Sequence, residues 1–373
     1  MNLEAVELRR IRLDLVSPFR TSFGSQTVRD ILLVHAFTDQ ADGWGECVAL
    51  AGPVYSSEYV DGAQHALTHH LLPRLFAEAS LTADGVGTAL APVVGHRMAK
   101  ACIEMAVLDA QLRSHRTSWA EHFGAVRDEV DCGVSVGIHD SISQLLETVE
   151  GYLADGYRRV KLKIEPGWDV EPVKEVRRRW PDILLQVDAN TAYTLADARR
   201  LQRLDEFDLL LIEQPLPEEQ VLAHAQLQKQ VQTPICLDES ITSAQAAADA
   251  IALGACRIVN VKPGRVGGYL EARRVHDVCA AHGVPVWMGG MLETGLGRAG
   301  NVALAALPNF TLPGDTSASD RYYHRDVTEP FVMHDGRLGV PDGPGLGVSV
   351  DEAYLKEITT SVEVLRASEL APA

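Results

Sequence analysis

Hydrophobic and polar positions follow two different patterns along the 373 residues of the chain. From residue 1 to about 125, apolar runs with strand character come first and stretches with helical spacing follow. The clearest helical stretch is 96–115, where apolar residues recur at spacings of three and four and form one stripe. Strands followed by helices are typical of a small α+β domain.

From about residue 126 onward, short apolar segments alternate with amphipathic segments such as 169–180 and 243–254, which we expect to be helices. The apolar segments are too hydrophobic for a half-solvated sheet, and none of them runs into a G-x-G-x-x-G turn. This pattern favours an α/β fold with a closed parallel barrel over an open dinucleotide-binding sheet. The eight expected strands are 132–138, 159–164, 183–189, 208–214, 234–240, 257–263, 284–290 and 310–315.

Composition narrows the classes of partner and compartment. A formal charge of −17 argues against a nucleic-acid partner, because neutralising phosphates needs clustered Lys and Arg. The N-terminus lacks the apolar core of a secretory signal, and no apolar run approaches the ~20 residues that span a bilayer. The six cysteines are far apart in the sequence and form no C-x-x-C pair. We therefore expect a cytoplasmic protein with reduced thiols and no membrane partner.

Five charged residues recur at the ends of successive expected strands. Lys163, Asp188, Glu213 and Asp238 follow one another at intervals of 25 residues, and Lys262 comes 24 residues later. In a βα barrel the C-terminal ends of the strands converge on one mouth, from which catalytic groups project. A single carboxylate there could instead be the N-cap of the following helix. Five charged residues at this regular spacing predict one shared site. Charged groups crowded on a water-poor face are energetically costly unless they pair with one another.

The chemistry of this set indicates a hard cation beside amines. Three carboxylates without His or Cys favour Mg²⁺ or Mn²⁺ over zinc. Lys161 and Lys163 share one strand face and would flank the cation from one side, with Lys262 on the other. Nearby positive charge should lower the pKa of a lysine toward the range in which it acts as a base. Such an arrangement can remove the proton next to a carboxylate while the enediolate is stabilised.

These residues resemble the enolase superfamily, in its muconate-lactonising-enzyme subgroup, and are most similar to its N-acylamino acid (N-succinylamino acid) racemase and o-succinylbenzoate synthase group. The resemblance covers nearly the whole chain. It is carried by K-x-K at 161–163, VDAN at 187–190, IEQP at 212–215, LDES at 237–240 and VNVKPGRVGG at 259–268, followed by GGMLETGLG and LPGDTSASD.

The resemblance implies a (β/α)₇β modified TIM barrel with an N-terminal α+β capping domain that the C-terminal segment completes. The implied boundaries are 1–125 for the cap, 126–320 for the barrel and 321–373 for the returning segment. It also implies that Lys163 and Lys262 are an acid/base pair on opposite faces of a small carboxylate substrate, with Lys161 as an electrostatic helper. The implied Mg²⁺ ligands, for which Mn²⁺ or Co²⁺ could substitute, are Asp188, Glu213 and Asp238. Members of this family often form homo-oligomers, either octamers or dimers.

Two cap loops of this family close over the barrel mouth, and they correspond here to residues 17–26 and 49–59. Their aromatic, Gly and Ser content is that of a lid around an apolar group, although ordinary loops share this composition. Arg265, three residues after Lys262, is expected to lower the pKa of that lysine, unless it is an exposed helix-start residue. The candidate substrate contacts are Phe19, Tyr55, Ser135, Asn190, Gly290, Met291, Glu293 and Ser317. The candidate residues behind the charged set are Glu239, Arg265 and Asn260.

Several functions are compatible with this set of residues. Racemisation of an N-acylated amino acid and dehydration to o-succinylbenzoate both pass through an enediolate, and dipeptide epimerase and muconate cycloisomerase are further alternatives within the family. An aldolase that uses a Schiff-base lysine and no metal is an alternative of another class. A non-catalytic barrel is disfavoured because none of the five charged positions carries a neutral residue.

Overall fold

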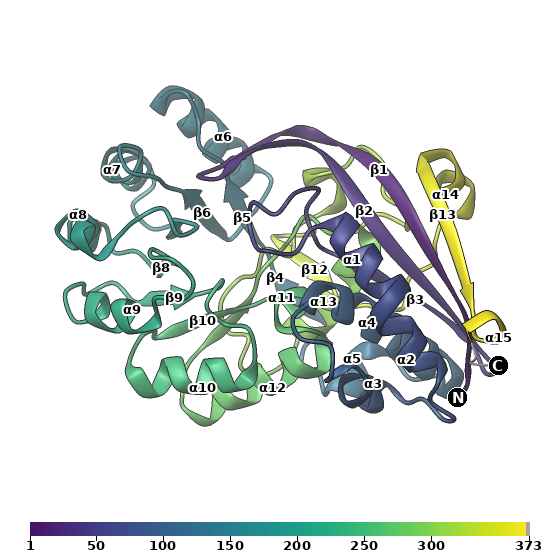
Figure 1. Ribbon diagram of the computed structural model, residues 1–373. Helices are drawn as coiled ribbons and strands as arrows, with labels where there is room; N and C mark the ends of the chain where they lie inside the picture. The colour runs from purple at the N-terminus through teal and green to yellow at the C-terminus, as the bar shows by residue number, and fades with distance from the viewer. Residues whose placement is uncertain (371–373) are drawn as a thin grey trace.

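Seven parallel strands form a curved sheet in the computed structural model, which describes residues 1–370 (Figure 1). The strands lie in the order β11-β10-β9-β8-β7-β6-β5, so each is beside its neighbour in sequence. This is the topology expected of consecutive βα units. Their bounds are β5 (Gly133–Val136), β6 (Arg159–Lys163), β7 (Leu184–Asp188), β8 (Ile212–Glu213), β9 (Ile235–Leu237), β10 (Ile258–Val261) and β11 (Val286–Met288).

The segment 310–315 closes the barrel without forming a continuous strand. Phe310 bridges Val286 at one edge of the sheet, and Gly314 bridges Cys132 at the other edge. Pro313 lies between these bridges and has no N–H to donate, which accounts for the interrupted ladder. The predicted barrel is confirmed, with its eighth position held by two isolated bridges.

The expected strand 208–214 is shorter than predicted, since only Ile212 and Glu213 are paired. Asp208 takes a left-handed backbone conformation with φ 47°, which ends the preceding turn, so the strand begins later than expected.

The expected helices 169–180 and 243–254 are confirmed as α7 (Val170–Arg179) and α10 (Ala244–Leu253). The barrel helices are α6 (Ile142–Ala154), α7 (Val170–Arg179), η2 (Leu195–Asp197), α8 (Ala198–Gln202), η3 (Arg203–Phe207), α9 (Val221–Gln228), α10 (Ala244–Leu253), α11 (Pro263–Val266), α12 (Tyr269–Ala281) and α13 (Gly295–Ala305).

The cap contains an antiparallel sheet in the order β13-β1-β2-β3, with helices packed on it. One edge strand of this sheet comes from the C-terminal segment, because β13 (Thr359–Arg366) pairs with β1 (Leu3–Thr21) (Figure 1). Residues 371–373 of that segment lie outside the described residues. The remaining cap elements are β2 (Gly24–Thr38), β3 (Asp42–Cys47), α1 (Val60–Ala66), the π-helix η1 (Leu67–Leu71), α2 (Leu72–Phe76), α3 (Ala83–Leu90), α4 (Arg97–His115) and α5 (Trp119–Phe123).

Short elements precede and follow the barrel strands. Strand β4 (Glu129–Asp131) pairs with β12 (Arg337–Gly339), and η4 (Ser319–Arg321), α14 (Glu352–Ile358) and α15 (Ala367–Leu370) complete the described structure. The long β1–β2 hairpin extends from the cap toward β5 and α6, where the Ile138 N–H donates a hydrogen bond to the Arg20 carbonyl (3.0 Å) (Figure 1). The hairpin tip is therefore held at the barrel mouth.

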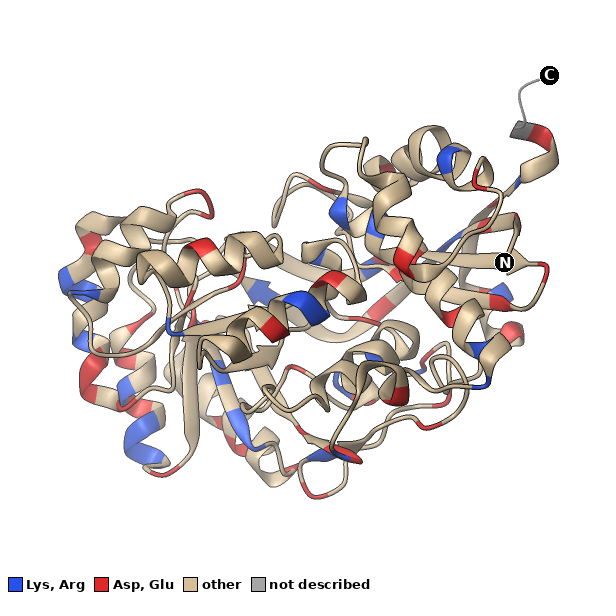
Figure 2. Ribbon diagram, turned by 90° about the horizontal axis from the view of Figure 1, so that it is seen from below, with Lys and Arg blue, Asp and Glu red and all other residues tan. Residues whose placement is uncertain are grey.

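Basic and acidic residues are interspersed over both domains rather than separated by sign (Figure 2). Among the described residues, no helix combines the length and the apolar character that crossing a membrane requires.

Strand β3 and helix α4 approach each other so closely that the strand needs glycine. A Cβ on Gly45 would lie 2.0 Å from the Cys102 carbonyl oxygen, and one on Gly43 would lie 2.2 Å from the Ala106 carbonyl oxygen. Both neighbours are helix backbone, which cannot move aside without displacing the whole of α4. The close packing of this helix against the sheet therefore depends on the two glycines.

We expect Gly45→Ala to lower the free energy of unfolding by about 2–3 kcal/mol, because the added methyl group overpacks the interface. Urea denaturation of the variant checks this. Gly151→Ala is the control: Gly151 lies exposed inside α6 with open space around its Cα, so this change should stabilise the protein by about 0.5–1 kcal/mol. Equal effects of the two changes would contradict the packing argument.

Candidate active site

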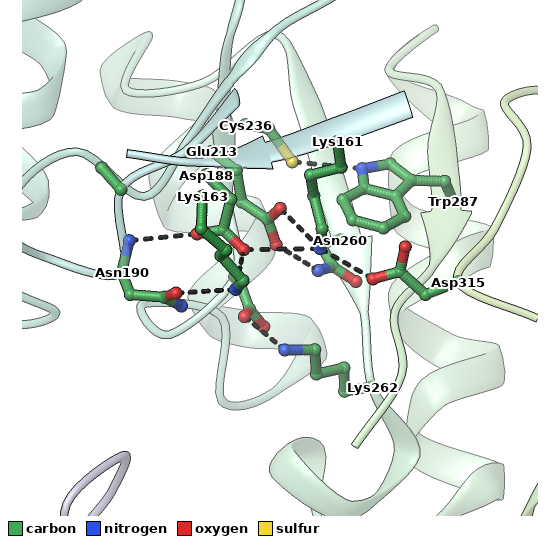
Figure 3. A network of polar contacts seen from close by, with 12 residues as sticks. Lys161, Lys163, Asp188, Asn190, Glu213, Cys236, Asn260, Lys262, Trp287 and Asp315 are labelled. Carbon is green, nitrogen blue, oxygen red and sulfur yellow. Dashed lines mark hydrogen bonds and ion pairs between the residues drawn. The ribbon is translucent and has the colours of Figure 1, made fainter. Parts of the chain in front are cut away.

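The five predicted charged residues meet at the C-terminal ends of their strands, and Figure 3 labels four of them, Lys163, Asp188, Glu213 and Lys262. Lys163 pairs in register with Asp188, and Asp188 with Glu213, across β6, β7 and β8. Asp238 directly follows β9 and Lys262 directly follows β10. All five side chains are buried. The 25-residue interval therefore corresponds to equivalent positions on neighbouring strands, which the closed sheet brings into one space.

Lys161 and Lys163 point from β6 into this space, and both form ion pairs with Asp188 Oδ2, at 3.4 Å and 2.6 Å. The Lys163 Nζ donates to Asp188 Oδ2 (2.6 Å) and to Asn190 Oδ1 (2.6 Å). The Lys161 Nζ donates to Glu213 Oε2 (3.1 Å) and to Asp315 Oδ2 (2.7 Å), and it lies 4.7 Å from the centre of a Trp287 ring. The two lysines are thus buried inside the barrel and paired with carboxylates. They are not on the solvated face of an edge strand.

Lys262 approaches from the other end of the row of strands. Its Nζ donates to Asp238 Oδ2 (2.6 Å) and to the Tyr55 hydroxyl (3.0 Å). Arg265 is buried as well: its Nε donates to the same hydroxyl (3.1 Å), and its guanidinium also binds the Glu239 carbonyl (2.8 Å). The alternative of an exposed helix-start arginine is therefore excluded, and Tyr55 of the cap is joined to both cations.

Amide side chains hold the carboxylates and lysines in place. Asn260 Nδ2 donates to Glu213 Oε1 (2.5 Å). Asn190 accepts from Lys163 through its Oδ1 and donates through Nδ2 to Glu239 Oε1 (3.1 Å). The backbone of Asn190 has φ 42°, a conformation that is uncommon outside glycine and is often found at functional sites. Two of the three residues predicted behind the charged set contact it directly, since Asn260 binds Glu213 and Arg265 lies 3.7 Å from Asp238. Glu239 reaches it only through Asn190, which binds Lys163.

A cavity opens directly above this set, and its other walls come from the cap and from barrel-side residues such as Met291 and Tyr322. The predicted first loop, 17–26, is the tip of the β1–β2 hairpin, and its Phe23 lies against Tyr55 of the second predicted loop, with ring centroids 6.0 Å apart. Phe19 packs edge-on against Tyr322 at 6.4 Å. Six of the predicted substrate contacts line the cavity together with the three lysines: Phe19, Tyr55, Ser135, Asn190, Gly290 and Met291. The cavity therefore combines ammonium groups at one end with aromatic and aliphatic side chains at the other.

Glu293 and Ser317, which were also predicted to contact substrate, do not line the cavity. Glu293 accepts hydrogen bonds from the Met291 N–H (2.9 Å) and from Asn301 Nδ2 (3.0 Å). The Ser317 carbonyl accepts from Arg298. Both residues lie behind the wall, because their polar groups are used by the backbone and side chains that build it.

Asp315 and Tyr322 line the cavity although the sequence did not single them out. Asp315 accepts hydrogen bonds from Arg159 and from Lys161, so it fixes the position of the first lysine of the K-x-K motif. It ends the expected segment 310–315, so the rule of charged residues at strand ends could have found it, although its spacing from Lys262 breaks the 25-residue interval. Tyr322 lies in a connection after the barrel, where no periodic signal points to it.

The carboxylates that face Lys262 and Lys161 raise the pKa values of these two lysines. Burial lowers the pKa of Lys262, but Asp238, Tyr55 and Glu213 outweigh it and the pKa lies well above its ordinary value. Lys161 behaves likewise, since Asp315, Glu213 and Asp188 oppose the effect of burial and raise its pKa. Each ammonium group faces carboxylates more closely than it faces other cations, which is the physical reason for the increase. The predicted lowering rests on a cation held by the same carboxylates and stays a prediction.

The carboxylates of Asp188, Glu213 and Asp238 suit a divalent cation for two reasons: they are hard oxygen donors, and one of their oxygens has no hydrogen-bond partner. Within residues 1–370, no group of three or more His, Cys, Asp or Glu side chains is arranged to bind a metal, and lysine ammonium groups face the carboxylates. Asp238 Oδ1 is nevertheless buried without a hydrogen-bond partner. Burial and the negative charge of Asp188 raise the pKa of Glu213 to about 8. Three hard oxygen donors on adjacent strands, with one oxygen free, could hold a hard cation.

Comparison with known proteins identifies the family. Residues 144–354, more than half of the chain, match the family model described as enolase C-terminal domain-like. The chain belongs to the enolase superfamily. Residues 5–124 of this enolase-superfamily protein match the model of the mandelate racemase / muconate lactonizing enzyme N-terminal domain. The predicted family is therefore confirmed, and with it an enzyme whose family implies a divalent metal.

Its relatives within the enolase superfamily extend over almost the whole chain. An N-succinylamino acid racemase from Amycolatopsis sp is 68% identical over 97% of this chain and 98% of its own. An o-succinylbenzoate synthase from Geobacillus kaustophilus is 47% identical over 96% of both chains. A crystal structure of an enolase-superfamily member from Listeria innocua superposes with a TM-score of 0.95 at 38% identity, covering 98% of this chain and 100% of that one.

Proposed function

We propose that this protein is an N-acylamino acid racemase that acts on N-succinylamino acids, and that the same site can dehydrate a cyclohexadiene carboxylate to o-succinylbenzoate. The observation that carries the proposal is the placement of Lys163 and Lys262, which line one cavity from strands separated by the three that carry the carboxylates. Two amines on opposite sides of one carbon are what proton exchange with inversion requires. The high identity to a racemase and the substantial identity to a synthase support both activities.

In this proposal Asp188, Glu213 and Asp238 hold Mg²⁺, with Mn²⁺ or Co²⁺ able to substitute. When bound, the cation supplies positive charge that stabilises the negative charge developing on the substrate carboxylate. Asn260 orients Glu213 through its 2.5 Å hydrogen bond, and Gln214 Oε1 accepts the Asp238 N–H (3.0 Å) and so fixes the backbone at that carboxylate. These contacts hold the oxygens in a common orientation.

The lysines move the protons. Lys163 Nζ takes the α-proton on one face of the substrate, and Lys262 Nζ returns a proton on the other face, which inverts the centre. Lys161 does not exchange protons with the substrate in this scheme. It is held 2.7 Å from Asp315 and 3.1 Å from Glu213, where its charge stabilises the enediolate. The aromatic lids exclude water and pack against the apolar part of the substrate.

The deciding experiment is an assay of the purified protein with Mg²⁺ against both substrate types. Racemisation is followed by polarimetry of N-succinyl-phenylalanine, and dehydration by the absorbance of o-succinylbenzoate. We expect both, and the absence of both would reject the proposal. Turnover of dipeptides or of muconate without turnover of either substrate would favour the dipeptide epimerase or muconate cycloisomerase alternatives. Neighbouring genes for menaquinone synthesis or for an aminoacylase would indicate the physiological role.

Removing the metal is expected to abolish turnover and to lower the melting temperature, because buried carboxylates repel one another without a cation. Restoring Mg²⁺ at about 100 times its Kd should raise the free energy of unfolding by about 2.7 kcal/mol. Activity assays and thermal denaturation after dialysis against EDTA measure both effects. Full activity in excess chelator would contradict the metal assignment.

Metal-independent turnover would favour the Schiff-base aldolase. Borohydride trapping with a carbonyl substrate would then label Lys163 or Lys262.

Two further properties belong to the proposal. We infer a homo-oligomer, either an octamer or a dimer, since the resemblance to the family carries this expectation, and sedimentation of the purified protein tests it. We also infer a cytoplasmic location. The six cysteines are buried and unpaired in the described structure, as expected of a reduced compartment.

A further inference from the structure

The start of helix α13 is held by a carboxylate from the cap. Glu46 on β3 is buried, and its Oε2 accepts from the Thr294 hydroxyl (2.6 Å) and from the Gly297 N–H (3.0 Å). Its Oε1 accepts from the Thr294 N–H (3.0 Å). The N–H groups of Thr294 and Gly297 are among the backbone donors that an 11-residue helix leaves unpaired at its N-terminus, where negative charge is also favoured. The cap thereby fixes the position of a barrel helix.

Glu293 transmits this restraint to the wall of the cavity. It precedes Thr294, and its Oε1 accepts from Asn301, a residue inside α13 (3.0 Å). Its Oε2 accepts from the N–H of Met291, which lines the cavity (2.9 Å). Arg298, also on α13, donates to the Glu293 carbonyl (2.9 Å). The position of the helix therefore sets the position of the Met291 backbone.

The wall that these contacts support is strained and lies close to Lys262. Leu292 has φ 59°, which is unfavourable for a leucine, and its carbonyl is held by the Tyr323 hydroxyl (2.6 Å). A Cβ on Gly289 would lie 2.1 Å from Asn260 Oδ1 and 2.6 Å from the Lys262 Cε. A wall released from its supports would relax away from this conformation, and the space beside Lys262 would change shape.

We propose that Glu46 is a positioning residue: acting through α13 and Glu293, it sets the shape of the cavity wall at Met291 and Leu292 and so the preference among amino-acid side chains of the substrate. Glu46 does not line the cavity, so it acts only through these residues. The part that concerns substrate preference rests on the proposed function. The part that concerns the wall does not.

The test compares Glu46→Gln with Glu104→Gln. Glutamine at 46 keeps the size of the side chain, loses its charge and turns an NH₂ group toward N–H donors. Glu104 is a matched control because it is also a buried cap carboxylate at the start of a barrel helix, where it accepts from the Leu270 N–H (3.1 Å), but no residue of that helix lines the cavity. Both changes should lower the melting temperature.

Only Glu46→Gln should alter the wall. We expect hydrogen–deuterium exchange of residues 289–296 to become at least ten-fold faster, and the ratio of kcat/KM for N-succinyl-phenylalanine to that for N-succinyl-alanine to change at least five-fold, mainly through KM. If Glu46→Gln does not fold, Thr294→Val removes one of the same hydrogen bonds and should produce the same two changes in smaller measure. Glu46→Asp, which keeps the charge, should restore part of the ratio.

Unchanged exchange at 289–296 in a folded Glu46→Gln protein would overturn the positioning role. Faster exchange with an unchanged substrate ratio would overturn its link to specificity. If the unaltered protein turns over no N-succinylamino acid, the proposed function fails, while the exchange measurement still decides whether Glu46 holds the wall.

Discussion

Replacing Lys163 with alanine is expected to abolish both racemisation and dehydration, with a loss of at least about 1,000-fold in kcat, because general acid–base groups contribute on this scale. Lys163 is the base on one face of the substrate in the proposed mechanism, and dehydration can use it first as base and then as acid toward the leaving hydroxide. Its neighbour Lys161 cannot replace it, since Lys161 is held by Glu213 and Asp315.

The matching change at Lys262 separates the two reactions. Lys262→Ala should abolish racemisation, because the proton can no longer return on the second face. Lys163 remains on its own face, so the variant should still exchange the α-proton of one amino-acid enantiomer with deuterium. Dehydration could also fall, since Lys262 adds positive charge near the developing carbanion, and its loss there is therefore not diagnostic.

NMR-detected exchange in D₂O with each pure enantiomer is the decisive measurement. Lys174→Ala provides a control, because this lysine is exposed on α7 and does not line the cavity, so its loss should leave exchange unchanged. The two-face assignment is wrong if Lys262→Ala exchanges the α-proton of both enantiomers equally well. It is also wrong if Lys163→Ala racemises the substrate as fast as the unsubstituted protein does.

Neutralising any one of the three carboxylates is expected to weaken Mg²⁺ binding by about 100-fold or more and to remove activity. The changes are Asp188→Asn, Glu213→Gln and Asp238→Asn, each nearly isosteric. A variant that keeps normal activity at low Mg²⁺ would show that its residue is not a ligand. Isothermal titration calorimetry measures the affinity, and circular dichroism shows that the fold persists.

Asp315→Asn is the control for these three. Asp315 is also buried, faces the same Lys161 and ends the segment at the eighth position of the barrel, but it is not assigned to the metal. We expect this variant to bind Mg²⁺ with nearly unchanged affinity while losing activity through displacement of Lys161. Loss of Mg²⁺ affinity equal to that of Asp188→Asn would make Asp315 a fourth candidate ligand.

The sequence by itself was sufficient for the barrel and for the meeting of the charged residues. Side chains two apart on a strand share a face, and strands of equal βα units end at one mouth, so the interval from Lys163 to Lys262 already implied a common site. The family motifs around these residues led to the same family that the comparisons identify. Local periodicity carries this information because it depends only on neighbours along the chain.

Tertiary structure alone decided what contacts lie around that site. Glu293 and Asp315 are both carboxylates after barrel strands, yet Glu293 turns behind the wall to bind Met291 and Asn301, whereas Asp315 turns inward to Lys161. Likewise Glu46, 248 residues from Thr294, has no sequence signal that marks it as a support for α13. Side-chain direction in loops and contacts between domains depend on packing partners distant in sequence, because these elements have no fixed period that would place their side chains.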